Sequence, residues 1–140
     1  TKVNKEQYFI ITHDYAVCAA RAMLSVNPEI SFVFLSGQGA DSSEKSRILF
    51  ARVKGQTENA LKLLPFKHLY ILRPAGIVPV FQNGNLLVPK KSKFSILKLM
   101  AMVLPQMTIS TVVLAQAMLI LIKSGEPFML LENKNIKAII

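Results

Sequence analysis

Two short runs of uncharged apolar residues constrain the fold of this chain most strongly. Phe32–Leu35 and Leu69–Leu72 lack the alternation of polar and apolar residues expected of a strand with one face in water. Continuous apolar strands are typical of a parallel sheet that helices cover on both faces. The sequence has 140 residues, 51% of them hydrophobic. It is therefore long enough and apolar enough to bury such a sheet.

Helical patterns surround these two runs. From Tyr8 to Val26, apolar residues recur at steps of three and four, which predicts a helix, and Asn4 and Gln7 have the spacing of its capping pair. A second helix is expected over residues 46–64, where Pro65 ends it. The apolar stripe of the first helix consists of Ile11, Tyr15, Cys18, Ala22 and Val26.

The order helix, strand, helix, strand predicts an α/β fold with right-handed crossovers. The strands at 31–35 and 67–72 are expected to be neighbours in a parallel sheet, with both helices beside them. We assign residues 1–80 to this unit. Cys18 lies among small apolar residues, so we expect it to be a buried thiol.

Residues 81–140 are predicted to form a small, mostly helical lobe, with helices at 95–104 and 111–122 and a last strand at 128–131. The stretch 99–122 contains no charged residue and is long enough to span a bilayer. Pro105 and several polar residues divide it into two shorter helices, which argues against a membrane span. Those polar residues are Gln106, Thr108, Ser110, Thr111 and Gln116.

The net charge of +9 does not indicate a nucleic-acid-binding protein. The densest basic cluster contains one aromatic residue, Phe94, and no arginine, whereas single-strand binding requires several stacking platforms. We interpret the cluster as a solvated face. It consists of Lys90, Lys91, Lys93 and Lys98.

The spacing of the residues argues against a dinucleotide fingerprint, a serine-hydrolase site and a metal site. Gly37-Gln38-Gly39 follows a strand, but the dinucleotide fingerprint requires a third glycine where this chain has Ser42. Ser36 is not a hydrolase nucleophile, because the nucleophile elbow requires glycine where Phe34 stands. Two isolated histidines and one cysteine predict no metal site. The single cysteine and the polar start of the sequence favour a cytoplasmic location.

One constellation of residues remains. Ser36 ends the first strand, Phe50 and Lys54 lie one helical turn apart, and Arg73-Pro74 leads through a loop to Ile77. With its flanking sequence, this arrangement resembles the extended or atypical branch of the short-chain dehydrogenase/reductase superfamily. It is most similar there to NAD(P)-dependent epimerase/dehydratase-like proteins akin to tat-interacting oxidoreductases. The similar segments are Ser36-Gly37-Gln38-Gly39-Ala40-Asp41, Ala51-Arg52-Val53-Lys54-Gly55-Gln56-Thr57-Glu58, Leu64-Pro65-Phe66-Lys67, Arg73-Pro74 and Leu131-Glu132-Asn133.

The resemblance implies roles for these residues. Ser36 would bind the reacting oxygen of a small carbonyl or hydroxyl substrate. Lys54 would hold the nicotinamide ribose, and Pro74 and Ile77 would also contact the cofactor, NAD or NADP. The family's general acid/base is a tyrosine, but its position holds Phe50, which has no proton to give. An oxidoreductase or epimerase and a catalytically silent nucleotide-sensing or interaction protein therefore both remain open.

The resemblance covers the C-terminal half of the family's Rossmann-like NAD(P)-binding domain. Family members begin with a strand and a glycine-rich turn whose helix amides bind the pyrophosphate, and this sequence contains no such segment. We therefore expect a fragment, a truncation or half of a split protein that binds NAD or NADP poorly by itself. The resemblance also implies a homodimer through the helices at 8–26 and 46–64.

Overall fold

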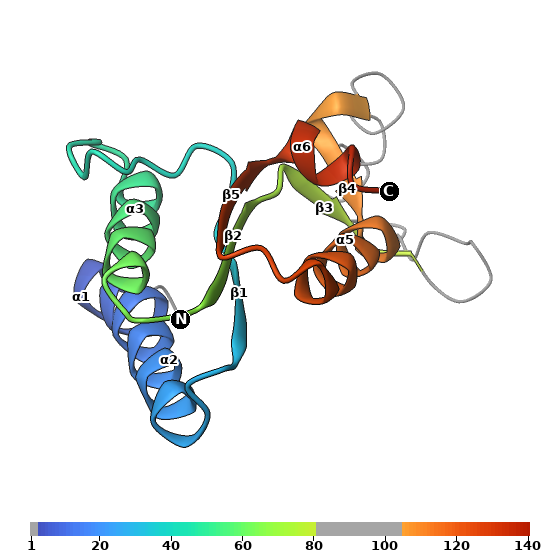
Figure 1. Ribbon diagram of the computed structural model, residues 1–140. Coiled ribbons are helices and arrows are strands. Elements are labelled where there is room, and N and C mark those ends of the chain that lie inside the picture. Colours follow the sequence, from blue (N-terminus) through green and yellow to red (C-terminus); the bar gives the residue numbers. More distant parts are fainter. Residues whose placement is uncertain (1–2, 81–104) are drawn as a thin grey trace.

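The computed structural model describes residues 3–80 and 105–140, and it has the alternating helices and strands of an α/β protein (Figure 1). The predicted helix at 95–104 and the lysine cluster at 90–98 lie outside the described residues. The elements are α1 (Lys5–Phe9), the π-helical turn η1 (Ile10–Asp14), α2 (Tyr15–Val26), β1 (Ser31–Leu35), α3 (Leu49–Lys62), β2 (His68–Arg73), β3 (Gly76–Val78), the 3-10 turn η2 (Pro105–Met107), β4 (Thr108–Ser110), α5 (Thr111–Ser124), β5 (Phe128–Glu132) and α6 (Asn133–Lys137).

The main sheet is parallel, with the strand order β1-β2-β5. Ser31 is opposite His68 in the first pair of strands, and Leu69 is opposite Phe128 in the second. The predicted α/β class and the pairing of the strands at 31–35 and 67–72 are therefore confirmed. A separate parallel pair, β3-β4, was not predicted; each of its strands is three residues long.

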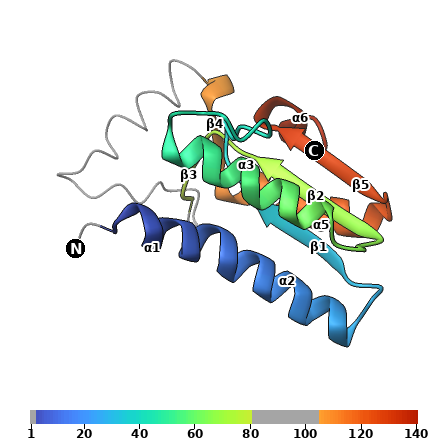
Figure 2. The same cartoon turned by 90° about the vertical axis from the view of Figure 1, so that its left-hand side faces the viewer.

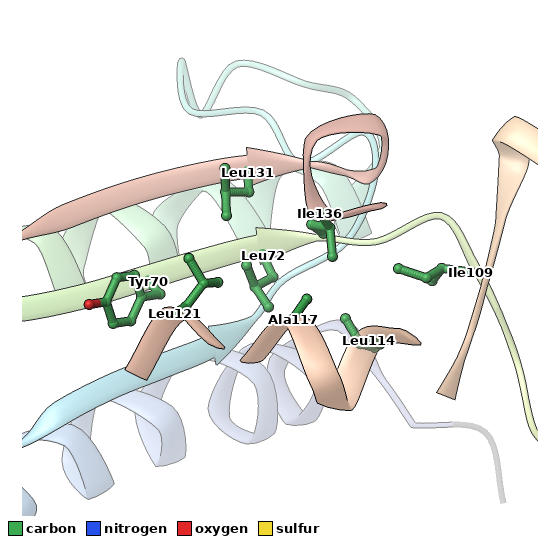
Figure 3. Close-up of a cluster of buried hydrophobic side chains, with 8 residues drawn as sticks. All are labelled: Tyr70, Leu72, Ile109, Leu114, Ala117, Leu121, Leu131 and Ile136. Atoms are coloured by element: carbon green, nitrogen blue, oxygen red, sulfur yellow. The ribbon is translucent and has the colours of Figure 1, made fainter. Parts of the chain in front are cut away.

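Strand β2 shows why continuous apolar runs were the informative signal. Side chains alternate between the two faces of a strand. Leu69 and Ile71 pack with α2 and α3 on one face, whereas Tyr70 and Leu72 pack with α5, α6 and β4 on the other. All four are buried, with 4% exposure or less. The sheet thus lies between two helical layers (Figure 1), and Figure 3 shows the core on the α5 side.

Helices α1 and α2 run on through η1 as one long rod beside the sheet (Figure 2). The predicted capping pair is confirmed: Asn4 Oδ1 accepts from the Gln7 amide, and the Gln7 side chain accepts from the Asn4 amide. The rod packs on α3 at η1, where the buried Thr57 hydroxyl is within reach of the Thr12 carbonyl, at 3.4 Å. The hydroxyl donates its one proton mainly to the Val53 carbonyl of α3, at 2.8 Å, so the contact with Thr12 is the weaker of the two.

The predicted apolar stripe of this rod faces away from the core. Val17 and Ala20 make the buried contact, while Tyr15 and Val26 are 63% and 86% exposed. Cys18 is also exposed, so the expectation of a buried thiol was wrong. Periodicity shows that a helix has an apolar face, but here the buried Val17 and Ala20, outside the predicted stripe, pack in the core cluster with Leu61 of α3. Within the described residues, Lys5–Val26 is also the one helix long and apolar enough to cross a membrane.

Helix α3 begins at Leu49 rather than at residue 46. The Asp41 carboxylate accepts hydrogen bonds from the backbone amides of Ser43, Lys45 and Ser46. Those bonds hold the preceding residues in a turn. The hydrogen bond from the Ser43 hydroxyl, followed by those from the backbone amides, lowers the pKa of Asp41. Hydrogen bonds from several donors stabilise the charged form of a carboxylate. The amides of residues 43, 45 and 46 make these bonds, so the helix begins only after the turn.

Gly55 allows α3 to lie against the same turn. A Cβ at this position would stand 1.8 Å from the Asp41 carbonyl oxygen, a contact that only a backbone shift can relieve. By contrast, Gly125 ends α5 in the left-handed conformation, with open space around its Cα.

We predict that Gly55→Ala lowers the free energy of unfolding by about 3 kcal/mol, because the methyl group overpacks a backbone contact. Gly125→Ala, the matched control, should cost only about 1 kcal/mol, because it introduces backbone strain without a clash. Urea denaturation of both variants measures the difference. Equal costs would show that α3 does not approach the turn at Gly55.

Candidate functional site

A pocket opens where β1 and β2 end. It has a volume of about 410 Å³. The carboxyl ends of parallel strands are where ligands bind in open α/β sheets. Four of the residues singled out in the sequence line this pocket, namely Ser36, Phe50, Pro74 and Ile77; the others are Gly37, Gln38, Ala75 and Gly76.

The backbone beyond β1 brings these residues together. The Ser36 amide donates to the Leu72 carbonyl at 2.8 Å, and the Gln38 amide donates to the Pro74 carbonyl at 2.9 Å. These bonds continue the parallel pairing past the last residue of β1. The loop after the first strand is thereby held against the loop after the second.

Phe50 forms one wall of the pocket. Its ring lies so close to Gly37 that a Cβ there would be 2.7 Å from the ring's Cζ atom. The side chain remains 39% exposed, so it is not a core residue. Phe50 therefore presents an apolar ring to the pocket, at the position where the family resemblance expects a tyrosine.

Lys54 lies one helical turn beyond Phe50 but does not line the pocket. Its ammonium group donates to the Leu35 carbonyl at 3.1 Å and lies 4.9 Å from the centroid of the Phe34 ring. Burial lowers the pKa of Lys54, and the charge of Glu58 opposes this effect. Because the folded state holds this proton less tightly than the unfolded state, this group's contribution to stability increases as the pH rises through the lowered pKa.

The Ser36 hydroxyl belongs to a buried charged cluster that the sequence did not predict. Ser36 Oγ donates to Glu58 Oε1 at 2.5 Å, and the Glu58 side chain is fully buried. Arg73 holds the same carboxylate at two points, with Nε 2.9 Å from Oε1 and Nη2 2.5 Å from Oε2. This two-point geometry is the strong form of an arginine–carboxylate pair.

Further contacts anchor Arg73 at the edge of the cluster. Its Nη1 donates to Glu132 Oε1 at 2.9 Å, and its Nη2 donates to Ser42 Oγ at 2.7 Å. Hydrogen bonds to Glu58 and then to Glu132 raise the pKa of Arg73, against the effect of burial. The guanidinium thus joins α3, the ends of β2 and β5, and the loop after β1.

Asn133 supports the side of the pocket formed by Ala75, a role that the sequence did not predict. It is 3% exposed, and its Oδ1 accepts from the Ala75 amide at 3.0 Å. Its Nδ2 donates to the Gln106 carbonyl at 2.8 Å. One amide side chain therefore fixes the connection between β2 and β3, at Ala75, to the segment that leads into β4.

The comparisons with known proteins give no family assignment. No protein-family model matches the sequence, and no curated protein matches it either. Among the described residues, no group of three or more histidine, cysteine or acidic side chains has a geometry that would hold a metal ion. The geometry of the pocket and its buried cluster is thus the main guide to function.

Glu58 and Glu132 provide a matched test of the cluster, because both carboxylates pair with Arg73. We predict that Glu58→Gln lowers the free energy of unfolding by about 3 kcal/mol, since it removes the charge that compensates a mostly buried guanidinium. Glu132→Gln should cost less than about 1 kcal/mol, because the Glu132 side chain is 48% exposed. Chemical denaturation at neutral pH measures both. Similar costs would contradict the assignment of Glu58 as the principal partner.

Proposed function

We propose that this chain carries the nicotinamide side of an NAD(P)-binding protein of the short-chain dehydrogenase/reductase type. In this proposal the parallel sheet, with β5 as its third strand, is part of a Rossmann-like domain. One observation carries the proposal: Ser36, Phe50, Pro74 and Ile77 meet in one pocket at the carboxyl ends of two parallel strands.

The pocket residues fit the flat end of such a cofactor. Phe50, Pro74 and Ile77 supply apolar surface for a planar ring. When bound, a nicotinamide cofactor supplies or accepts a hydride. Lys54 is the residue that would hold the ribose. Its ammonium group would first have to leave the Leu35 carbonyl, to which it now donates.

Phe50 favours a second candidate function. A positioned acid/base contributes about 10²–10⁴-fold to the rate of a reaction that needs proton transfer. A phenyl ring supplies none of this, and it closes the pocket with an apolar wall instead. The same pocket thus also suits a catalytically silent nucleotide-sensing or interaction protein. The oxidoreductase and the nucleotide-sensing protein both require nicotinamide binding, whereas an interaction protein does not, and none of them identifies the small-molecule substrate. We place either protein in the cytoplasm.

Nicotinamide mononucleotide is the direct probe of this proposal. We predict that it shifts the backbone amide resonances of Gly37, Gly76 and Ile77, with a dissociation constant in the millimolar range. NAD should bind no more tightly, because this sequence lacks the glycine-rich turn that would hold its second phosphate and adenosine. Titration by two-dimensional nitrogen–proton NMR measures both affinities.

Adenosine monophosphate is the control ligand and should leave the three resonances unchanged. Nicotinamide mononucleotide that shifts only resonances remote from the pocket would contradict the proposed function. Micromolar NAD binding would instead show that the chain holds the whole cofactor.

We also propose that the chain forms a homodimer through the rod of α1 and α2 with α3. The rod exposes a continuous apolar face, and isolated surface helices seldom leave such a face in water. Tyr15 and Ile11, 63% and 54% exposed, lie near its middle.

Tyr15→Glu should weaken this dimer at least tenfold, because it puts a charge into a desolvated apolar contact. Leu119→Glu, on the exposed side of α5 at 60% exposure, is the matched control and should leave the association unchanged. Sedimentation equilibrium measures both. A wild-type chain that stays monomeric at high concentration would rule out the dimer.

A further inference from the structure

Ser36 has one proton to give, and the buried cluster already uses it. A serine hydroxyl has one donor hydrogen and two acceptor lone pairs. The Ser36 hydroxyl donates to Glu58 Oε1 at 2.5 Å, the short distance typical of a hydroxyl bound to a charged carboxylate. Ser36 is also one of the residues that line the pocket. Whether Ser36 can donate a hydrogen bond to a ligand, or only accept one, depends on whether its hydroxyl proton can leave Glu58.

The surroundings of Glu58 keep the proton in place. Arg73 donates to both oxygens of the carboxylate, and a guanidinium has no acceptor to offer in return. Glu58 is thus a pure acceptor surrounded by donors, and Ser36 is one of them. A ligand carbonyl that drew this proton away would leave a fully buried carboxylate with one donor fewer. The net loss in binding corresponds to a factor of about 10 to 100.

We propose that Ser36 acts in this pocket as a hydrogen-bond acceptor, so that the pocket prefers a ligand bearing a hydroxyl group to one bearing a carbonyl at the same place. Glu58 is then the positioning residue that sets this polarity, with Arg73 holding it. The inference rests on the proposed function for the pocket's role as a ligand site, and it names the class of ligand: an alcohol. It also narrows the role that the family resemblance implies for Ser36, which is to bind the reacting oxygen of either a carbonyl or a hydroxyl substrate.

The test uses two ring compounds of nearly equal size, cyclohexanol and cyclohexanone, which differ in the polar group alone. Each is titrated into the 140-residue chain, and the amide resonances of Gly37, Gly76 and Ile77 report binding. We expect the alcohol to bind about tenfold more tightly than the ketone. In Ser36→Ala this ratio should fall to about one, whereas Ser36→Thr, which keeps the hydroxyl, should retain it.

Ser42→Ala is the matched control. Its hydroxyl lies 3.3 Å from the other oxygen of Glu58 and does not line the pocket, so the ratio should not change. Equal affinity for the two compounds, a preference for the ketone, or no binding of either would each overturn the proposal. Nicotinamide mononucleotide reports on the proposed function separately: if it binds while the alcohol shows no preference, only the inference about Ser36 fails.

Discussion

The buried pair of Glu58 and Arg73 is the interaction on which the rest of this structure depends. A fully buried carboxylate is tolerated only when other groups satisfy it, and here Arg73 satisfies it from the end of the central strand. Because Glu58 lies on α3 and Arg73 ends β2, their bond fixes the helix relative to the sheet. Ser36, directly after β1, and Glu132, at the end of β5, join the same pair. The pocket is built on the strand ends that this cluster holds.

Much of the fold could be predicted because a strand that is buried on both faces has a continuous run of apolar residues in its sequence. The runs at 32–35 and 69–72 have no alternation of polar residues, so neither face of these strands is expected to face water. A parallel sheet covered by helices on both faces is the fold that this pattern predicts. The long N-terminal helix was predicted as an element, yet its apolar stripe turned out to face away from α3. The pattern at Ile11, Tyr15 and Val26 marks an apolar face, but the sequence does not say which partner covers it. The β3-β4 pair was too short to leave any periodic signal.

The pocket residues were partly accessible to sequence reasoning, and the charged cluster was not. Ser36 and Phe50 were singled out through a resemblance that spans a strand end and a helical turn. Glu58 went unnoticed because a glutamate in a helix ordinarily faces water. One signal was available: Glu58 follows Ala51 and Gly55 at steps of four and three, so it shares a stripe with two small residues that are buried. A charged residue within such a stripe of small residues indicates a buried charge that another side chain must pair with.

The position of the Ser36 hydroxyl proton tests this account most directly, and proton NMR of the chain with isotope-labelled serine can locate it. We expect a slowly exchanging hydroxyl resonance for Ser36, shifted downfield, with a nuclear Overhauser contact to the γ-methylene protons of Glu58. A Ser36 hydroxyl that exchanges with water as fast as those of exposed serines, and shows no contact to Glu58, would contradict it.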